Sequence, residues 1–213
     1  MAKPSPAPRI SSREYRRKRL IEATIAAIAR HGLSRVTISH VADIAGVSHG
    51  LLIFHFQSKE KLLAETLRYM SDEHRKTWEE ALQSAPASAA ARLDALIRAE
   101  FDTKNQSQDS LAAWCAFWGE APNRPRYLEQ CGVNDRAQID AFDSICGALA
   151  AEGGYELEPR RAARVLRLTI EGVWLELMFS AKPYSHDEAV TTAYFCAAAL
   201  FPRHFGEDGL ISR

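Results

Sequence analysis

Residues 37–56 read TISHVADIAGVSHGLLIFHF and carry the pattern that decides the fold. Two helices that cross at a steep angle through a short turn need a small residue where their backbones meet, and Ala42 fits that position. The turn needs a residue that tolerates a positive φ, which Gly46 supplies. The second helix must return an apolar side chain to the first, and Leu52 stands at the required spacing. The spacing therefore predicts a helix-turn-helix.

Hydroxyl residues and the spacing of apolar residues predict further helices on both sides of this turn. Three helices are expected to begin after side chains that accept hydrogen bonds from free first-turn amides, namely Thr37, Ser48 and Ser58. An earlier helix is expected to begin at Ser11 or Ser12 and to stop at His31-Gly32. Residues 71–213 show helical periodicity and no strand-like alternation. The sequence therefore predicts an all-α protein.

The two parts of the chain carry opposite charge. Residues 1–70 contain twelve Lys and Arg against five Asp and Glu, a net charge of +7, whereas residues 71–213 contain fifteen against twenty-two, a net charge of −7. A basic front part joined to an acidic rear part indicates a polyanion-binding module attached to a domain with another task. We expect a disordered tail over 1–11, a helix-turn-helix domain over 12–70, and a ligand-binding and dimerisation domain over 71–213.

The run from Thr37 to Ser48, followed by FHFQSKEKLL at 54–63, resembles the DNA-binding domain of TetR-type repressors. The resemblance covers residues 12–70 closely and implies a recognition helix over residues 48–55. The first residues of a recognition helix point into the major groove of double-stranded operator DNA. His49 is therefore the first choice for a contact with a base edge, and Gly50 permits a close approach of the backbone.

Other residues of this part are expected to contact phosphates, which position the protein without reading sequence. Thr37, Ser48 and Lys59 stand at predicted helix N-termini, where free amides can bind a phosphate. Arg35 adds positive charge. Many members of the family place a tyrosine in the stretch occupied here by Ile53-Phe54. Phe54 is assigned to the DNA surface, without the phosphate contact that a tyrosine hydroxyl would make. His55 and Phe56 are expected to pack between helices.

Aromatic residues one helical turn apart, together with carboxylates, predict a ligand site in the rear domain. The candidates are Asp102, Trp114, Phe117, Trp118, Glu171 and Trp174. Several indole faces beside a carboxylate suit a quaternary ammonium ion, whose charge is diffuse and poorly hydrated. The alternative interpretation of the aromatic stripes is ordinary core packing.

The stretches 101–102, 113–118, 171–175 and 180–183 resemble the BetI-type choline sensors of the same family. The resemblance implies a repressor that choline releases from the genes for choline uptake and glycine betaine synthesis. One alternative is a TetR-type repressor that responds to an apolar or xenobiotic ligand. Another is an all-helical enzyme, although the chain has no phosphate-binding loop and no metal-ligand or nucleophile motif. No cofactor and no metal ion are expected.

Two long helices are expected near the C-terminus, over residues 159–180 and 185–201. Apolar residues recur at three- and four-residue steps along the first, as in a helix packed lengthwise against another: Ala163, Leu166, Ile170, Val173 and Leu177. The second carries small residues that permit close approach: Ala189, Ala193, Ala197 and Ala198. The family resemblance implies a homodimer formed through these two helices, and a two-fold DNA site also requires a dimer.

The remaining expectations concern the cellular compartment. No apolar run approaches the roughly 20 residues that a membrane span requires, and the N-terminus lacks the apolar stretch of a secretory signal. We therefore expect a cytoplasmic protein without membrane contact. The four cysteines are scattered without metal-ligand spacing, so they are expected to be reduced thiols packed in the core.

Overall fold

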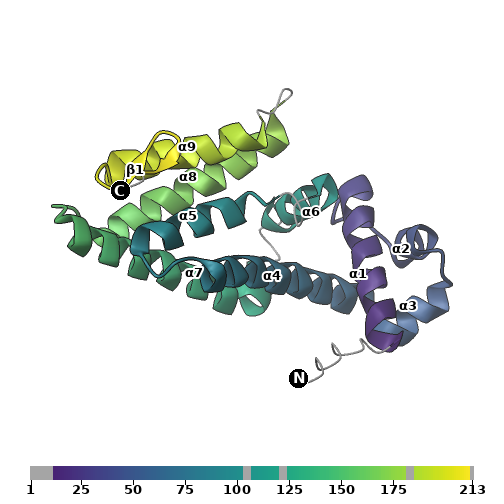
Figure 1. The fold of residues 1–213 in the computed structure, drawn as a ribbon. Helices are drawn as coiled ribbons and strands as arrows, with labels where there is room; N and C mark the ends of the chain where they lie inside the picture. The colour runs from purple at the N-terminus through teal and green to yellow at the C-terminus, as the bar shows by residue number, and fades with distance from the viewer. Residues whose placement is uncertain (1–11, 103–106, 120–123, 181–184, 212–213) are drawn as a thin grey trace, which may run out of the picture.

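The computed structural model describes residues 12–102, 107–119, 124–180 and 185–211. The front part consists of α1 (Ser12–His31), α2 (Ile38–Ala45), α3 (His49–Phe56) and α4 (Lys59–Ser84). The rear part adds α5 (Ala89–Glu100), α6 (Gln108–Gly119), α7 (Arg124–Gly153), α8 (Pro159–Phe179) and α9 (His186–Leu200). Figure 1 shows α1–α3 gathered at one end, with α4 and α7 running lengthwise beneath α8 and α9. The all-α prediction is confirmed.

The corner between α2 and α3 has the predicted construction. The hydroxyl of Thr37 accepts a hydrogen bond from the backbone N–H of His40 at 3.2 Å, and Ser48 accepts one from Leu51 at 3.3 Å. Gly46 takes the left-handed conformation with φ 66°. Ala42 and Leu52 are buried where the two helices meet. Because each cap satisfies an amide that its helix leaves free, these residues define where the helices begin.

Gly46 and Gly50 provide a matched test of this corner. A Cβ added at either position meets no atom within 4 Å, but only Gly46 has a positive φ. We expect Gly46→Ala to lower the free energy of unfolding by about 1–2 kcal/mol, the cost of a left-handed L-residue. Gly50→Ala should instead raise it by about 0.5–1 kcal/mol, because glycine weakens a helix. Urea unfolding at one protein concentration measures both, and equal midpoints for the two variants would contradict the assignment.

Helix α4 links the front and rear parts. It begins at the predicted cap Ser58, whose hydroxyl accepts a hydrogen bond from Lys61 at 3.2 Å, and it continues to Ser84. The predicted boundary at residue 70 therefore falls inside one continuous helix of 26 residues. Apolar and small residues buried along α4 reach both ends, from Leu62 to Leu82. One continuous helix therefore belongs to both the front and the rear part.

The rear core gathers the inward faces of α4, α5, α7, α8 and α9. The predicted stripe on α8 is buried at Ala163, Leu166, Ile170 and Val173, and Ala189, Ala193 and Ala197 of α9 are fully buried. These side chains therefore pack within the protomer itself. Helix α8 ends at Phe179 and α9 begins at His186, close to the predicted limits.

One short element differs from the prediction of helices throughout. Phe205–Gly206 (β1) and Gly209–Leu210 (β2) pair as an antiparallel hairpin after α9. Gly209 has a φ of 118°, and the buried Phe205 ring stacks on Tyr194 at 6.4 Å between centroids. The two-residue loop Glu207-Asp208, followed by Gly209, is a hairpin turn that a search for helical periodicity does not detect.

The four cysteines lie in the interior or at its edge. Cys131 and Cys146 are buried, Cys115 and Cys196 are half-buried, and all four are free thiols. Burial raises the pKa of Cys131 and of Cys146 to about 12, which keeps both thiols protonated. Within the described ranges, no helix combines the length and the apolar character needed to cross a bilayer.

Candidate DNA-binding surface and ligand cavity

The outer face of α3 is exposed along its whole length. His49, Gly50, Ile53 and Phe54 all face solvent, and Phe54 is 73% exposed. The opposite face of the helix is anchored by the buried Leu52 and by Phe56. The N-terminal end of α3 is therefore exposed, as in the recognition helix of a helix-turn-helix.

The predicted phosphate-contacting residues lie at the ends of the helices of the front part. Thr37 and Ser48 are exposed and each caps its own helix, so the first amides of α2 and α3 also lie at the surface. The Lys59 ammonium donates to the backbone carbonyl of Ser34 at 3.3 Å, and the Arg35 guanidinium donates to that of His31 at 3.1 Å. Both cations are therefore held against backbone carbonyls at the end of α1 and in the segment that follows it.

One residue of the arginine cluster at 16–19 has a structural role. The Arg17 guanidinium pairs with Glu65 of α4, donates to the backbone carbonyl of His55 at 3.3 Å, and lies over the Phe56 ring at 4.7 Å. Phe56 is buried as predicted, whereas His55 is only half-buried. Arg17 therefore ties α1 to α3 and α4, and the exposed Arg16 and Arg19 carry the outward positive charge.

A cavity of about 520 Å³ opens between α4, α5, α6, α7 and α8. Five of the six predicted ligand residues line it: Trp114, Phe117, Trp118, Glu171 and Trp174. Asp102 does not line this cavity; it follows the end of α5, where its backbone N–H donates to the carbonyl of Ala99 at 3.3 Å. We call this space the aromatic cavity.

The indole rings of the aromatic cavity are fixed by contacts with one another and with the backbone. Trp114 and Trp118 lie 5.9 Å apart between ring centroids at an interplanar angle of 36°. The Trp118 N–H donates to the Tyr127 hydroxyl at 3.3 Å, and the Trp174 N–H donates to the carbonyl of Glu100 at 3.0 Å. These contacts fix the positions of three indole rings whose faces carry the negative part of the ring quadrupole.

Two carboxylates of the aromatic cavity were not among the predicted residues. Glu100 is 5% exposed, and its carboxylate accepts hydrogen bonds from Gln138 at 2.6 Å and pairs with His74 at 3.1 Å. Asp135 of α7 also lines the cavity, and burial raises the pKa of its carboxyl group. A sequence signal for Glu100 existed, because it continues the buried stripe of Leu96 and Ile97 on α5. A carboxylate on a core-facing stripe indicates a paired buried charge.

Glu171 has a more open setting than Glu100. Its side chain is 52% exposed and pairs with Arg167 one turn earlier on α8, at 3.1 Å. Burial raises the pKa of the Glu171 carboxyl group, and the Arg167 guanidinium opposes that effect. The cavity therefore holds three carboxylates and one guanidinium among its lining side chains, with Glu100 the most deeply buried of the acids.

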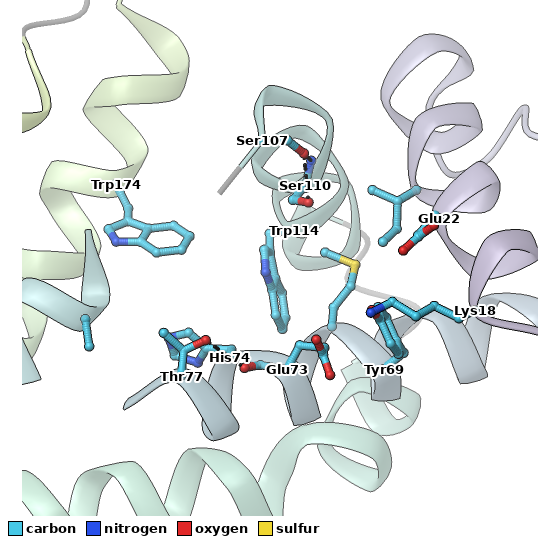
Figure 2. A pocket seen from close by; sticks show the side chains of 13 residues that line it. Lys18, Glu22, Tyr69, Glu73, His74, Thr77, Ser107, Ser110, Trp114 and Trp174 are labelled. Atoms are coloured by element: carbon cyan, nitrogen blue, oxygen red, sulfur yellow. Dashed lines mark hydrogen bonds between the residues drawn. The ribbon is translucent and has the colours of Figure 1, made fainter. Parts of the chain in front are cut away.

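A second, smaller cavity lies between the front part and the aromatic cavity. It has a volume of about 300 Å³, and Figure 2 shows Trp114 standing between Trp174 on one side and the α1 residues Lys18 and Glu22 on the other. His74, Trp114 and Trp174 line both cavities. We call the smaller space the junction cavity, because it separates α1 from α8.

An apolar face of α8 and α9 is exposed on the outside of the protomer. Val165, Leu168, Leu175 and Phe179 follow one another at three-, seven- and four-residue steps along α8, and Phe179 is 75% exposed. Phe195 of α9 is exposed as well. This face lies beside the buried stripe that the sequence pattern identified on α8. Contiguous exposed apolar residues mark a surface for association.

Two protein families match parts of the chain. Residues 20–66 match the TetR family of bacterial regulatory proteins, and residues 89–202 match the C-terminal domain of BetI-type transcriptional repressors. Among curated relatives, the HTH-type transcriptional regulator BetI of Paraburkholderia phymatum is 33% identical, over 87% of this chain and 93% of that protein. The BetI protein of Paraburkholderia xenovorans is 30% identical over the same shares.

Solved structures share the fold. A transcriptional regulator of Pseudomonas aeruginosa PAO1 superimposes with a TM-score of 0.77 at 27% identity, covering 91% of this chain and 93% of that one. A regulator of Saccharomonospora viridis, solved in complex with choline, gives a TM-score of 0.72 at 22% identity, covering 83% of this chain and 92% of that one. With an exposed recognition-type helix in front and a BetI-type domain behind, this chain belongs to the TetR family of DNA-binding transcriptional repressors and is a regulator, not an enzyme.

Proposed function

We propose that choline, or a closely related quaternary ammonium compound, releases this repressor from the genes for choline uptake and glycine betaine synthesis. The observation that carries the proposal is the aromatic cavity, which combines three indole rings with the buried carboxylate of Glu100. The BetI names of the relatives and the choline complex of a protein with the same fold agree with it.

The chemistry of the aromatic cavity favours a cation without N–H groups. A quaternary ammonium donates no hydrogen bond, so ring faces and distant carboxylates are its best partners. The volume of about 520 Å³ lies within the range of small-molecule sites, about 300–1,000 Å³. An uncharged apolar effector, the alternative interpretation, would make no use of Glu100, Asp135 or Glu171.

Helix α6 connects the cavity to the DNA-binding part. Trp114 and Trp118 line the aromatic cavity, the buried Ala113 packs into the hydrophobic cluster of α1–α4, and Phe117 belongs to both. A ligand that repositions the two indoles shifts α6, and α6 packs directly on α1. Differential binding of the ligand to two arrangements of α6 then changes the affinity for DNA.

The operator is proposed to be bound by a dimer. Dimerisation through the exposed face of α8 and α9 places two α3 helices on successive half-sites, about 34 Å apart on one side of the duplex. His49 and Gly50 would then meet base edges, with Phe54 beside the backbone. Thr37, Ser48, Lys59 and Arg35 would contact phosphates on either side.

Trp114 provides the direct test. On a duplex that the protein selects from a random pool, choline should raise the apparent Kd of the wild-type protein. Trp114→Ala should keep DNA binding but require about 5- to 30-fold more choline, the equivalent of about 1–2 kcal/mol for one lost ring face. Trp114→Phe keeps a ring face and should retain most of the response. Operator binding that ignores millimolar choline in the wild-type protein would remove the proposal.

A further inference from the structure

His74 lies on the wall that the two cavities share. It projects from α4 at the floor of the junction cavity, next to Glu73 and Thr77 (Figure 2). Its Nε2 is 3.1 Å from Oε2 of Glu100, and its ring meets Trp174 edge to face at 6.3 Å between centroids. His74 therefore touches the most buried carboxylate of the aromatic cavity and one of its indole rings.

The surroundings of His74 are acidic. Glu100 faces it from α5 and Asp135 from α7, while α8 presents the Trp174 ring and, farther along the cavity, the Arg167–Glu171 pair. Burial, the largest single effect, disfavours the charged imidazole, but the charge and hydrogen bond of Glu100 together with the charge of Asp135 outweigh it and raise the pKa of His74 above its usual value. The raised pKa favours the imidazolium form of His74 paired with the Glu100 carboxylate.

On the other side, His74 faces the mixed charges of the junction cavity. Glu73 comes from the same helix, and Lys18 and Glu22 come from α1. Lys18 and Glu22 are exposed to solvent, so this cavity is open at that end. A proton that leaves His74 can reach water through the junction cavity without passing a ligand in the aromatic cavity.

We propose that His74 is the internal counter-cation of Glu100 in the empty protein, and that an organic cation entering the aromatic cavity takes over this carboxylate while His74 releases one proton. The imidazole keeps one N–H on Glu100, and its second proton passes to water. One positive charge enters and one leaves, so the charge of the cavity is conserved. This inference rests on the proposed function, since it supposes a cationic effector.

Electrostatics gives the reason for the exchange. An imidazolium and an ammonium within one cavity of about 520 Å³ repel each other. Glu100 is the nearest deeply buried anion, and it can balance only one of them. His74 thereby becomes a specificity-determining residue, because only a ligand that carries positive charge can replace the proton. A neutral ligand of the same shape leaves the His74–Glu100 pair intact.

Calorimetry of the full-length protein tests this exchange without any substitution. Choline and its uncharged isostere 3,3-dimethylbutan-1-ol are titrated at pH 6.5 in two buffers of different ionisation enthalpy. Binding of one choline molecule should release close to one proton. The affinity for choline should increase with pH, by up to about tenfold per pH unit below the pKa of His74, and should then level off. The isostere should release none and show no dependence on pH.

The variant His74→Gln tests whether His74 is the group that releases the proton. Glutamine keeps an N–H donor for Glu100 but cannot titrate, so proton release and the dependence of choline affinity on pH should both disappear. Proton release that persists in this variant would point to Asp135 instead and overturn the inference. Binding of choline to the wild-type protein without proton release would also overturn it, while leaving the proposed function intact. No choline binding at any pH would remove both.

Discussion

Leu168→Arg is expected to convert the protein into a monomer and to weaken its binding to a two-half-site operator about 10²–10⁴-fold, the advantage that linked binding provides. Leu168 is 55% exposed at the centre of the apolar face on α8, between Val165 and Leu175. In a two-fold dimer each substitution occurs twice, so two guanidinium groups would be buried without partners. Each monomer would then hold only one half-site.

Sedimentation and DNA binding at matched concentrations measure this prediction. Val133→Arg is the control, because Val133 is 76% exposed but lies on α7, outside the face formed by α8 and α9. The control should remain dimeric with unchanged operator affinity. A Leu168→Arg protein that stays dimeric, or that binds the operator as tightly as the wild type, would show that the dimer interface lies on another surface.

Glu100→Gln is expected to reduce the affinity for choline by roughly 30- to 150-fold, the equivalent of about 2–3 kcal/mol for one charge pair at a partly buried site. The substitution keeps the shape of the side chain and removes its charge. Measurement at a pH where the affinity of the wild-type protein for choline has levelled off is the most informative, because the pKa of His74 is raised and, in the proposed exchange, its imidazole is neutral when choline pairs with Glu100. Isothermal titration gives the affinity directly.

Glu171→Gln is the matched control for this experiment. Glu171 lines the same cavity, but its side chain is 52% exposed and its carboxylate already pairs with Arg167. A solvent-accessible pair contributes about 0–1 kcal/mol, so the control should change choline affinity by less than about fivefold. Equal losses in the two variants would show that the carboxylates share the charge, and a larger loss in Glu171→Gln would reverse the assignment.

The local structure of the front part could be read from the sequence because it depends on neighbours in the chain. Thr37, Ser48 and Ser58 cap helices, and Gly46 takes a positive φ, each through contacts within a few residues. The indole residues of α6 were identified for a related reason, since their spacing reports which residues share a helix face. The hairpin at residues 205–210 was missed, because two-residue strands leave no periodic signal.

The partners of the buried charges depended on distant segments. Glu100 is 26 residues from His74 and 38 from Gln138, and no local pattern brings these three side chains together. The same limit applies to α8, where two apolar stripes run in parallel. Periodicity alone cannot tell the stripe that packs inside the protomer, at Leu166 and Ile170, from the one left exposed at Leu168 and Phe179.

The sequence by itself thus determined the helices, the DNA-binding corner and the family, since caps, turns and periodic faces arise from interactions over a few residues. Only the tertiary structure decided which acid occupies the buried end of the aromatic cavity and which face of α8 remains open. Both depend on how α4, α5, α7 and α8 pack, because burial and electrostatic pairing are set by the groups that packing brings within a few ångströms.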